Sequence, residues 1–326
     1  MKYNEIFKNG YGEESLPADF DYVTEINKLK KEKNAIILGH YYQIPEVQNI
    51  SDYLGDSLAL AQAAEKTDAD IIIFAGVSFM AETAKILNPT KKVIIPDLNA
   101  GCSLSDSCPP DEFEKFVKKH PNHTVITYVN SSTKVKALSD IICTSSNAVK
   151  MVNSLPKDEK VLFAPDKNLG SYIQKITKRE MVIWDGACHV HKQFSLPRIV
   201  ELMKQYPEAE LIAHPECPNE ILIISAFVGS TSALLNYVST SKKQQFIVAT
   251  ESGILHQMNL KNPEKHLIPA PPEDSTCGCN DCSFMKLITL KKIYLSLKYE
   301  LPEIEIPEDL RIKALIPLKR MLDLSI

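Results

Sequence analysis

The stretch IILGHYYQ (residues 36–43) decides how the fold of this chain is interpreted. It begins as an uninterrupted apolar run and continues into a histidine, two tyrosines and a glutamine. An apolar run without alternation is typical of a strand in a parallel sheet that is covered on both faces. Two further stretches, VITYVNSS (125–132) and LIAHPECP (211–218), have the same form. Each predicts a buried strand whose C-terminal end leads directly into polar residues.

These three strands recur with a period of about 90 residues, which is too long for a solenoid unit but suits a small α/β domain. A second set of elements repeats in the same order: FAGVSFMAETA (74–84), ICTSSNAVKMV (142–152) and FVGSTSALLNY (227–237). Each passes from a strand through a turn of small or hydroxyl-bearing residues into a helix. Chance similarity stays open as an alternative, because short apolar strand patterns are common.

Strand and helix patterns alternate along the whole chain, which predicts parallel α/β layers. We therefore expect three homologous three-layer α/β/α domains with parallel sheets, arranged with pseudo-threefold symmetry. The expected domains are residues 1–104, 105–192 and 193–283, and the C-terminal helices at 284–326 are expected to pack on the first domain. Ligands of open α/β sheets bind at the C-terminal ends of the strands. Three such domains would offer three sets of strand ends to one central site.

The composition argues against several classes of protein. The chain has 326 residues, of which 44% are hydrophobic and 24% charged, an ordinary balance for a globular protein. A net charge of −4 gives no basis for binding nucleic acid or an anionic membrane. The N-terminus lacks the apolar segment of a secretory signal. The most apolar long stretch, ILIISAFVGSTSALLNYV (221–238), is interrupted by GSTS and predicts strand, loop and helix. We expect a cytoplasmic protein without nucleic-acid or membrane partners.

Most of the eight cysteines fall in three clusters: NAGCSLSDSC (99–108), WDGACHVH (184–191) and STCGCNDCSF (275–284). In a reducing compartment, clustered cysteines indicate metal binding or catalysis rather than structural disulfides. The first two clusters each follow a strand and an acidic turn, and the third lies at the corresponding place in the last third of the chain. One cysteine from each third would then contribute to a common metal site.

The spacing of these cysteines favours an iron–sulfur cluster over zinc. A closed zinc site normally needs a second local pair of ligands, which none of the three segments supplies. Three thiolates leave one iron of a [4Fe–4S] cluster open, and that iron can act as a Lewis acid on substrate oxygens. The chain has neither a G-x-G-x-x-G nor a G-x-x-x-x-G-K-[ST] motif, so nicotinamide and ATP chemistry are disfavoured. A structural zinc stays open as an alternative.

The strand ends and cysteine segments together resemble the quinolinate synthase family over nearly the whole chain. The matching stretches, in chain order, are ILGHYYQ, GDSLALA, FAGVSFMAETAKIL, AGCSLSDSC, TYVNSS, CTSSNA, PDKNLG, AHPEC, FVGSTSALLNYV, FIVATESGI and CSFMKLITL. Their number and order make the resemblance specific. It implies three homologous α/β domains around a [4Fe–4S] cluster with three cysteine ligands. It also implies condensation of iminoaspartate with dihydroxyacetone phosphate to quinolinate, with loss of phosphate and water, in NAD biosynthesis.

The resemblance implies roles for particular residues. The cluster ligands would be Cys102, Cys188 and Cys282. The residues implied in binding the dicarboxylate are His40, Ser57, Tyr128, Asn130, Ser145, His214, Glu216 and Thr231. Tyr42 matches the proton-transferring tyrosine of the family, and the His214–Glu216 pair is a further candidate for proton transfer. The segment CGCNDC (277–282) departs from the family pattern, which leaves the roles of Cys277 and Cys279 open.

The small-molecule partners implied are iminoaspartate and dihydroxyacetone phosphate, with L-aspartate oxidase as the upstream supplier of iminoaspartate. Two other functions stay open. One is another iron–sulfur hydro-lyase that acts on a hydroxy acid. The other is a zinc-stabilised α/β binding protein that uses the same strand ends without catalysis. Metal analysis separates these classes, because iron with acid-labile sulfide excludes the zinc protein.

Overall fold

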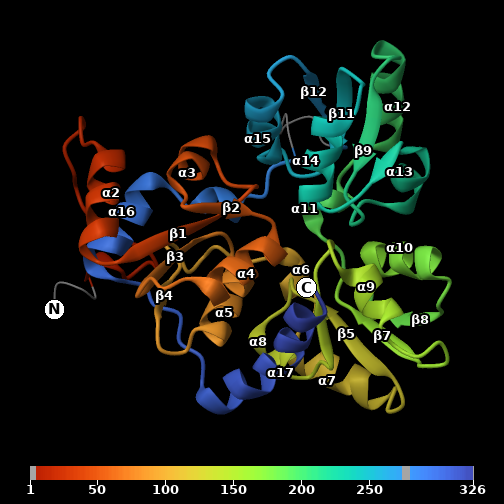
Figure 1. The fold of residues 1–326 in the computed structure, drawn as a ribbon, viewed down its shortest axis with the longest axis horizontal. Helices are drawn as coiled ribbons and strands as arrows, with labels where there is room; N and C mark the ends of the chain where they lie inside the picture. Colours follow the sequence, from red (N-terminus) through yellow and green to blue (C-terminus); the bar gives the residue numbers. More distant parts are fainter. Residues whose placement is uncertain (1–4, 274–279, 326) are drawn as a thin grey trace. The chain divides into compact units, whose positions relative to one another are not determined.

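A computed structural model describes residues 5–273 and 280–325, and this described part is an α/β protein with three parallel four-stranded sheets (Figure 1). The predicted α/β class with parallel sheets is therefore confirmed. The chain forms two compact units. Unit 1 comprises Met1–Cys102 and Ser283–Leu315, and unit 2 comprises Ser103–Cys282 and Ile316–Ile326. The three domain boundaries expected from the sequence stay a prediction.

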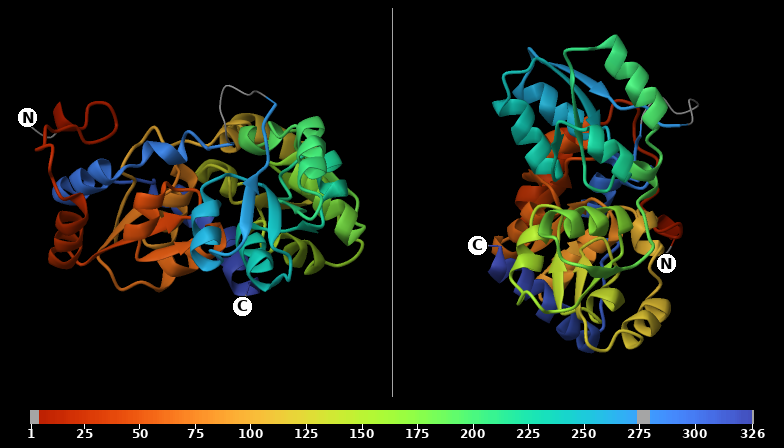
Figure 2. Two further views of the ribbon diagram at one scale, coloured as in Figure 1. Left: turned by 90° about the horizontal axis from the view of Figure 1, so that it is seen from above. Right: turned by 90° about the vertical axis from the view of Figure 1, so that its right-hand side faces the viewer.

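Unit 1 contains one sheet with the strand order β2-β1-β3-β4. Its strands are β1 (Ala35–His40), β2 (Tyr53–Gly55), β3 (Ile71–Ala75) and β4 (Lys92–Ile94). Its helices are α2 (Tyr22–Glu32), α3 (Pro45–Ile50), α4 (Ser57–Lys66), α5 (Ser78–Leu87), the 3₁₀ helix η1 (Met285–Leu287), α16 (Leu290–Tyr299) and the first part of α17 (Glu308–Leu324). Helices α2 and α16 come from opposite ends of the chain and lie side by side (Figures 1 and 2).

Unit 2 contains two sheets, with the orders β6-β5-β7-β8 and β10-β9-β11-β12. The strands of the first are β5 (Thr124–Tyr128), β6 (Ile141–Cys143), β7 (Val161–Ala164) and β8 (Met181–Ile183). Those of the second are β9 (Glu210–Ala213), β10 (Phe227–Val228), β11 (Gln245–Ala249) and β12 (His266–Pro269). The helices are α6 (Ser103–Asp106), α7 (Pro110–Lys118), α8 (Thr133–Lys136), α9 (Ala148–Asn153), α10 (Lys167–Thr177), α11 (His189–Lys192), α12 (Leu196–Gln205), α13 (Asn219–Ile224), α14 (Thr231–Thr240) and α15 (Ile254–Lys261).

The three sheets repeat one another in detail. Each has the same strand order. In each, the residue just before the strand that is second along the chain (β2, β6 or β10) donates its backbone N–H to a carbonyl of the strand that is first along the chain (β1, β5 or β9). The three donor and acceptor pairs are Asp52 to Ile37, Asp140 to Val125 and Ala226 to Leu211. These bonds make Ile37, Val125 and Leu211 equivalent. The repeat predicted from Ile36 therefore exists, but the first copy is shifted by one residue.

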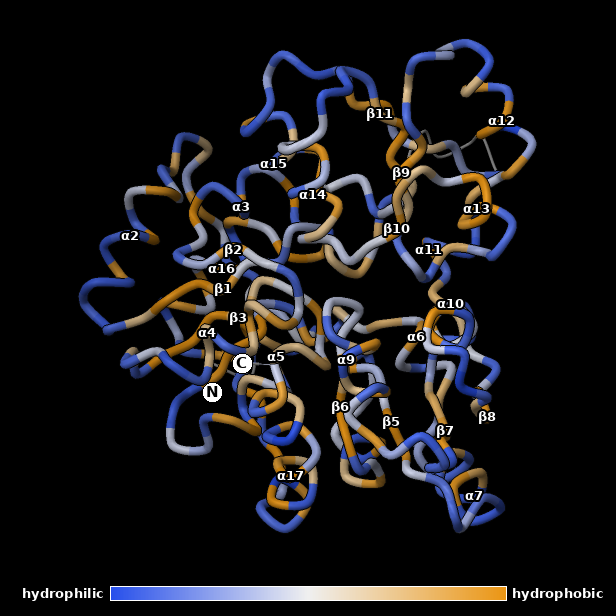
Figure 3. The backbone as a smooth tube through the Cα atoms, turned by 45° about the vertical axis from the view of Figure 1, so that its right-hand side comes forward, coloured by the Kyte–Doolittle hydropathy of each residue, from blue (hydrophilic) through white to orange (hydrophobic). Residues whose placement is uncertain are grey.

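The central strands of the sheets form the cores of the units. Residues of β3 and β7 are buried throughout, and those of β11 are buried after Gln245, without the alternation of a half-exposed strand. Figure 3 shows β1, β3 and β5 among the more hydrophobic parts of the backbone. Each fully buried Ile or Phe side chain contributes about 1.5–3 kcal/mol to folding. The polar residues that follow these strands are thus held on rigid supports.

The stretch at 221–238 differs from the prediction at its beginning. Helix α13 extends to Ile224, and only Phe227–Val228 form the strand that precedes α14. Pro218 stands at the N-cap of α13, and Glu220 lies in its first turn, where a negative charge is favourable. No helix in the described residues is long and apolar enough to cross a lipid bilayer.

Candidate active site at the strand ends

The strand ends of unit 2 bring together three of the predicted site residues. Tyr128 is the last residue of β5, while His214 follows β9 directly and Glu216 lies two residues further along. All three are buried, with at most 5% of each residue exposed. The Tyr128 side chain is hydrogen-bonded to the Glu216 carboxylate. The two sheets of unit 2 therefore contribute to one polar cluster inside that unit.

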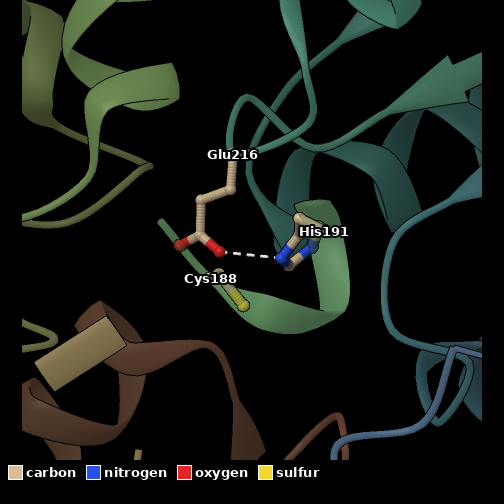
Figure 4. Close-up of side chains that lie close together, drawn as sticks. All are labelled: Cys188, His191 and Glu216. Atoms are coloured by element: carbon tan, nitrogen blue, oxygen red, sulfur yellow. Dashed lines mark ion pairs between the residues drawn. The ribbon is translucent and has the colours of Figure 1, made fainter. Parts of the chain in front are cut away.

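A second histidine, His191, completes this cluster (Figure 4). Its Nδ1 lies 2.8 Å from Oε2 of Glu216, and its Nε2 lies 3.0 Å from the Thr250 hydroxyl. The His191 and His214 rings are 4.8 Å apart between centroids. Sequence reasoning did not assign His191 a role. The available signal was its place three residues after Cys188, on the short helix α11 that begins next to this cysteine.

The ligand atoms of Cys188, His191 and Glu216 all lie within 4.8 Å of one another (Figure 4). Thiolate, imidazole and carboxylate are all metal-ligating groups. His191 and Glu216 are buried and Cys188 is half-buried, so this group is a candidate metal-binding site. It joins the cysteine segment after β8 to the residues that follow β9.

Two buried carboxyl groups in this cluster have opposite pKa shifts. Burial by itself would raise the pKa of Glu216, but the charges of His191 and His214 outweigh burial and hold that pKa at about 2. Burial and the nearby charge of Glu216 raise the pKa of Asp166 well above its usual range. Glu216 is therefore an anionic group held between the two imidazoles, with His191 Nδ1 at 2.8 Å and His214 Nδ1 at 4.0 Å from its Oε2.

Three other predicted residues of unit 2 lie a few residues beyond the ends of strands. The Ser145 hydroxyl, two residues after β6, lies 3.2 Å from Nε2 of His214. Thr231 is buried and begins α14, after the N-cap Ser230. Asn130 follows β5, and its buried Oδ1 accepts no hydrogen bond from the part of the chain that the structure describes. A buried acceptor without a donor is consistent with a position that receives one from a ligand.

The remaining predicted residues, His40, Tyr42 and Ser57, belong to unit 1. His40 is the buried last residue of β1, and its Nδ1 accepts the backbone N–H of Tyr42 at 3.1 Å. Their rings meet edge to face, 4.6 Å apart. The same local contact recurs in unit 2, where the N–H of Glu216 donates to Nδ1 of His214. Ser57 begins α4, next to the N-cap.

The described cysteines form two groups that differ in burial. Cys102, Cys188 and Cys282 are half-buried, whereas Cys108, Cys143 and Cys217 are buried. Burial raises the pKa of the Cys108 thiol to about 12 and also raises the pKa values of Cys143 and Cys217. Because a metal binds the thiolate, the three buried thiols are poor ligands at neutral pH. Cys277 and Cys279, whose roles the sequence left open, lie outside the described residues.

This sorting predicts how the thiols of the metal-free native protein react. We expect iodoacetamide to modify the half-buried set (Cys102, Cys188 and Cys282) at least roughly 100-fold faster than the buried set (Cys108, Cys143 and Cys217), because the buried thiols are both inaccessible and neutral. Mass-spectrometric mapping of the alkylated peptides with time measures each rate. The rates should converge in denaturant. Rapid native modification of Cys143 would contradict the assignment.

The fold and the cluster define a class: an α/β protein with a candidate metal-binding site beyond its strand ends. Residues 24–323 match the model of the family described as Quinolinate synthetase A protein. The quinolinate synthase of Thermosynechococcus vestitus is 58% identical over 95% of this chain and 97% of its own length. That of Chloroherpeton thalassium is 55% identical over 94% of this chain and 96% of its own length. The chain therefore belongs to the quinolinate synthetase A protein family, and it is an enzyme.

Proposed function

We propose that this chain is a quinolinate synthase of NAD biosynthesis. It condenses iminoaspartate with dihydroxyacetone phosphate to quinolinate, with loss of phosphate and water, and L-aspartate oxidase supplies the iminoaspartate. Membership of the family supports this proposal. The single structural observation that carries it is the group of Cys188, His191 and Glu216, whose ligand atoms lie within 4.8 Å of one another.

We propose that a [4Fe–4S] cluster is held by Cys102, Cys188 and Cys282. The donor set fits this cofactor, because these three cysteines are half-buried while the other described cysteines are buried. When bound, the cluster would supply an open iron that acts as a Lewis acid toward a substrate carboxylate or hydroxyl. The surrounding residues of the chain have separate tasks.

Binding and orientation of the anionic substrates fall to neutral donors and imidazoles. The proposed binding residues are His40, Ser57, Tyr128, Asn130, Ser145, His214, Glu216 and Thr231. Ser145 and His214 are already in contact, so a substrate oxygen near one of them would be within reach of both. A protonated imidazole gives charge-assisted hydrogen bonds to a carboxylate or phosphate, and these are stronger than neutral ones. We propose that the imidazoles of His40 and His214 donate such hydrogen bonds to anionic groups of the substrate.

Proton transfer is proposed for Tyr42 and for the His214–Glu216 pair. Condensation, isomerisation and loss of water each move a proton to or from the substrate. His214 can give or take a proton at its ring while Glu216, with its low pKa, stays charged. The imine substrate hydrolyses in water, so a site that excludes water protects it. The burial of Tyr128, His214 and Glu216 suits this requirement.

We also propose that the two units contain three homologous domains: residues 1–104 together with the helices of 284–326, residues 105–192, and residues 193–283. The common strand order of the three sheets supports this division. A pseudo-threefold arrangement of the domains about the cluster would let each contribute one cysteine ligand.

Anaerobic purification followed by metal analysis and a quinolinate assay tests the proposal. We expect iron and acid-labile sulfide in equal amounts, one cluster per chain, and quinolinate only when both substrates are present. Stoichiometric zinc without sulfide, in protein never exposed to air, would instead support a zinc-stabilised binding protein. A cluster with hydro-lyase activity but no quinolinate formation would support another iron–sulfur hydro-lyase.

A further inference from the structure

Two buried acidic side chains, Asp166 and Glu251, occupy equivalent positions in the two sheets of unit 2. Asp166 lies two residues after the end of β7, and Glu251 lies two residues after the end of β11. The strand register confirms the equivalence, because β7 pairs with β5 as β11 pairs with β9. Asp166 is completely buried, and Glu251 is 1% exposed. The proposed mechanism uses neither residue.

The Asp166 side chain connects its own turn with the segment that contains Cys188, a proposed metal ligand. One carboxylate oxygen, Oδ1, accepts the backbone N–H of Leu169 at 2.7 Å and so caps α10. The other oxygen, Oδ2, accepts the backbone N–H of Cys188 at 3.3 Å. A buried N–H group that lost this acceptor would be left without one, at a cost in free energy.

Glu251 makes the corresponding pair of bonds to the other cysteine segment. Its Oε2 accepts the backbone N–H of Gly253 at 2.7 Å, within its own turn. Its Oε1 accepts the backbone N–H of Cys282 at 2.9 Å. In both copies, one oxygen of the carboxylate therefore binds locally and the other binds the N–H of a half-buried cysteine distant in sequence.

In unit 1 the equivalent position is not occupied by an acidic residue. The register of β3 on β1 places Val77 at the equivalent position. There the N–H of Ser78 donates instead to the backbone carbonyl of Ala100, at 2.7 Å, in the segment before Cys102. The acidic side chain is thus present in both sheets of unit 2. In the sheet of unit 1, a backbone hydrogen bond occurs in its place.

We propose that Asp166 and Glu251 are positioning residues that fix the backbone at Cys188 and Cys282, so that both thiols are set in place before the metal binds. This inference rests on the proposed function, in which these cysteines are metal ligands. A preset ligand loses less conformational freedom when the metal binds, and supporting interactions around metal ligands typically affect affinity 10–100-fold.

The isosteric variants Asp166→Asn and Glu251→Gln test each tether separately. The remaining amide oxygen would keep the shorter, local bond, to Leu169 or to Gly253. The new amide NH₂ would then face the N–H of the cysteine, and two donors cannot form a hydrogen bond. Each substitution should therefore release one cysteine segment while it preserves the size of the side chain and its local bond.

Alkylation of the metal-free full-length chain gives a readout that is independent of activity. Rates are compared on the plateau of the pH–rate profile, where the thiols are fully ionised and a change in their pKa has no effect. We expect Glu251→Gln to raise the alkylation rate of Cys282 by roughly tenfold and to leave Cys188 unchanged, since one hydrogen bond is lost. Asp166→Asn should do the reverse. A general loss of structure would instead affect both cysteines in both variants.

Asp140→Asn is the matched control. The Asp140 carboxylate also accepts a backbone N–H in unit 2, that of Val125 at 2.8 Å, but near the opposite end of β5 from the site. In this variant, Cys188 and Cys282 should be alkylated at the same rates as in the wild type. Anaerobic reconstitution of all variants should show roughly 10–100-fold weaker retention of iron and sulfide against a chelator in Asp166→Asn and Glu251→Gln only.

Hydrogen exchange on the wild-type chain keeps the proposal falsifiable if a variant fails to fold. The N–H groups of Cys188 and Cys282 should exchange slowly, and exchange as fast as in an exposed loop would overturn the proposal. Folded variants with unchanged alkylation of the tethered cysteine would overturn it as well. If the wild-type chain binds no iron and the two variants still show the expected change at one cysteine each, the proposed cluster is refuted and the two tethers are confirmed.

Discussion

Replacement of Cys282 by serine should remove the iron–sulfur cluster and, with it, essentially all quinolinate formation. Serine keeps the size of the side chain, but clusters of this kind are held by cysteine thiolates and the serine hydroxyl is a poor iron ligand. Cys282 is half-buried, and its N–H is bound to the buried Glu251. Iron, acid-labile sulfide and visible absorbance of the anaerobically purified variant measure the loss, and the quinolinate assay measures activity.

Cys277→Ser and Cys279→Ser are the controls, and we expect both to retain iron, sulfide and activity. Of the three cysteines in this segment, Cys282 alone precedes SFMK (283–286), which matches the family pattern. A cluster that survives in Cys282→Ser but is lost in either control would transfer the role of ligand to that cysteine.

Tyr42→Phe should reduce turnover by roughly 10²–10⁴-fold, the usual contribution of a general acid or base, and leave the cluster in place. The substitution removes only a hydroxyl. The backbone N–H of Tyr42 bonds to His40, its carbonyl accepts Nζ of Lys286 at 2.7 Å, and its ring contacts the His40 ring. A phenylalanine keeps all three of these contacts. The steady-state kcat, compared with the iron content of the same sample, measures the effect.

The neighbouring residue Tyr41 provides the matched control for this assignment. Tyr41→Phe removes the same group one position earlier in the stretch HYYQ (40–43) and should leave turnover within a fewfold of the wild-type value. Near-normal quinolinate formation by Tyr42→Phe would rule out Tyr42 as the proton carrier. A large loss in Tyr41→Phe alone would move that role to Tyr41.

The sequence by itself determined the sheet architecture, because it depends on local patterns. An apolar run such as the one at 36–39 has the pattern of a strand covered on both faces, and β1 forms there. The period of the three strands predicted a repeated α/β unit, and the three sheets share one strand order. The polar residues after each run were recognised as site candidates for the same reason: strand ends define where ligands of α/β folds bind. The beginning of 221–238 was an exception, since a short apolar run can form either a helix or a strand.

Only the tertiary structure decided which distant side chains meet and which are removed from water. His191 became a site residue because packing places its Nδ1 2.8 Å from Glu216, a contact that no local pattern encodes. The division of the cysteines has the same origin: Cys143 and Cys217 are buried and hold neutral thiols, while Cys188 and Cys282 are half-buried. The bonds from Asp166 and Glu251 to cysteine segments 22 and 31 residues away also require the folded chain. Burial and side-chain contact depend on segments far apart in sequence, so they arise only when those segments pack together.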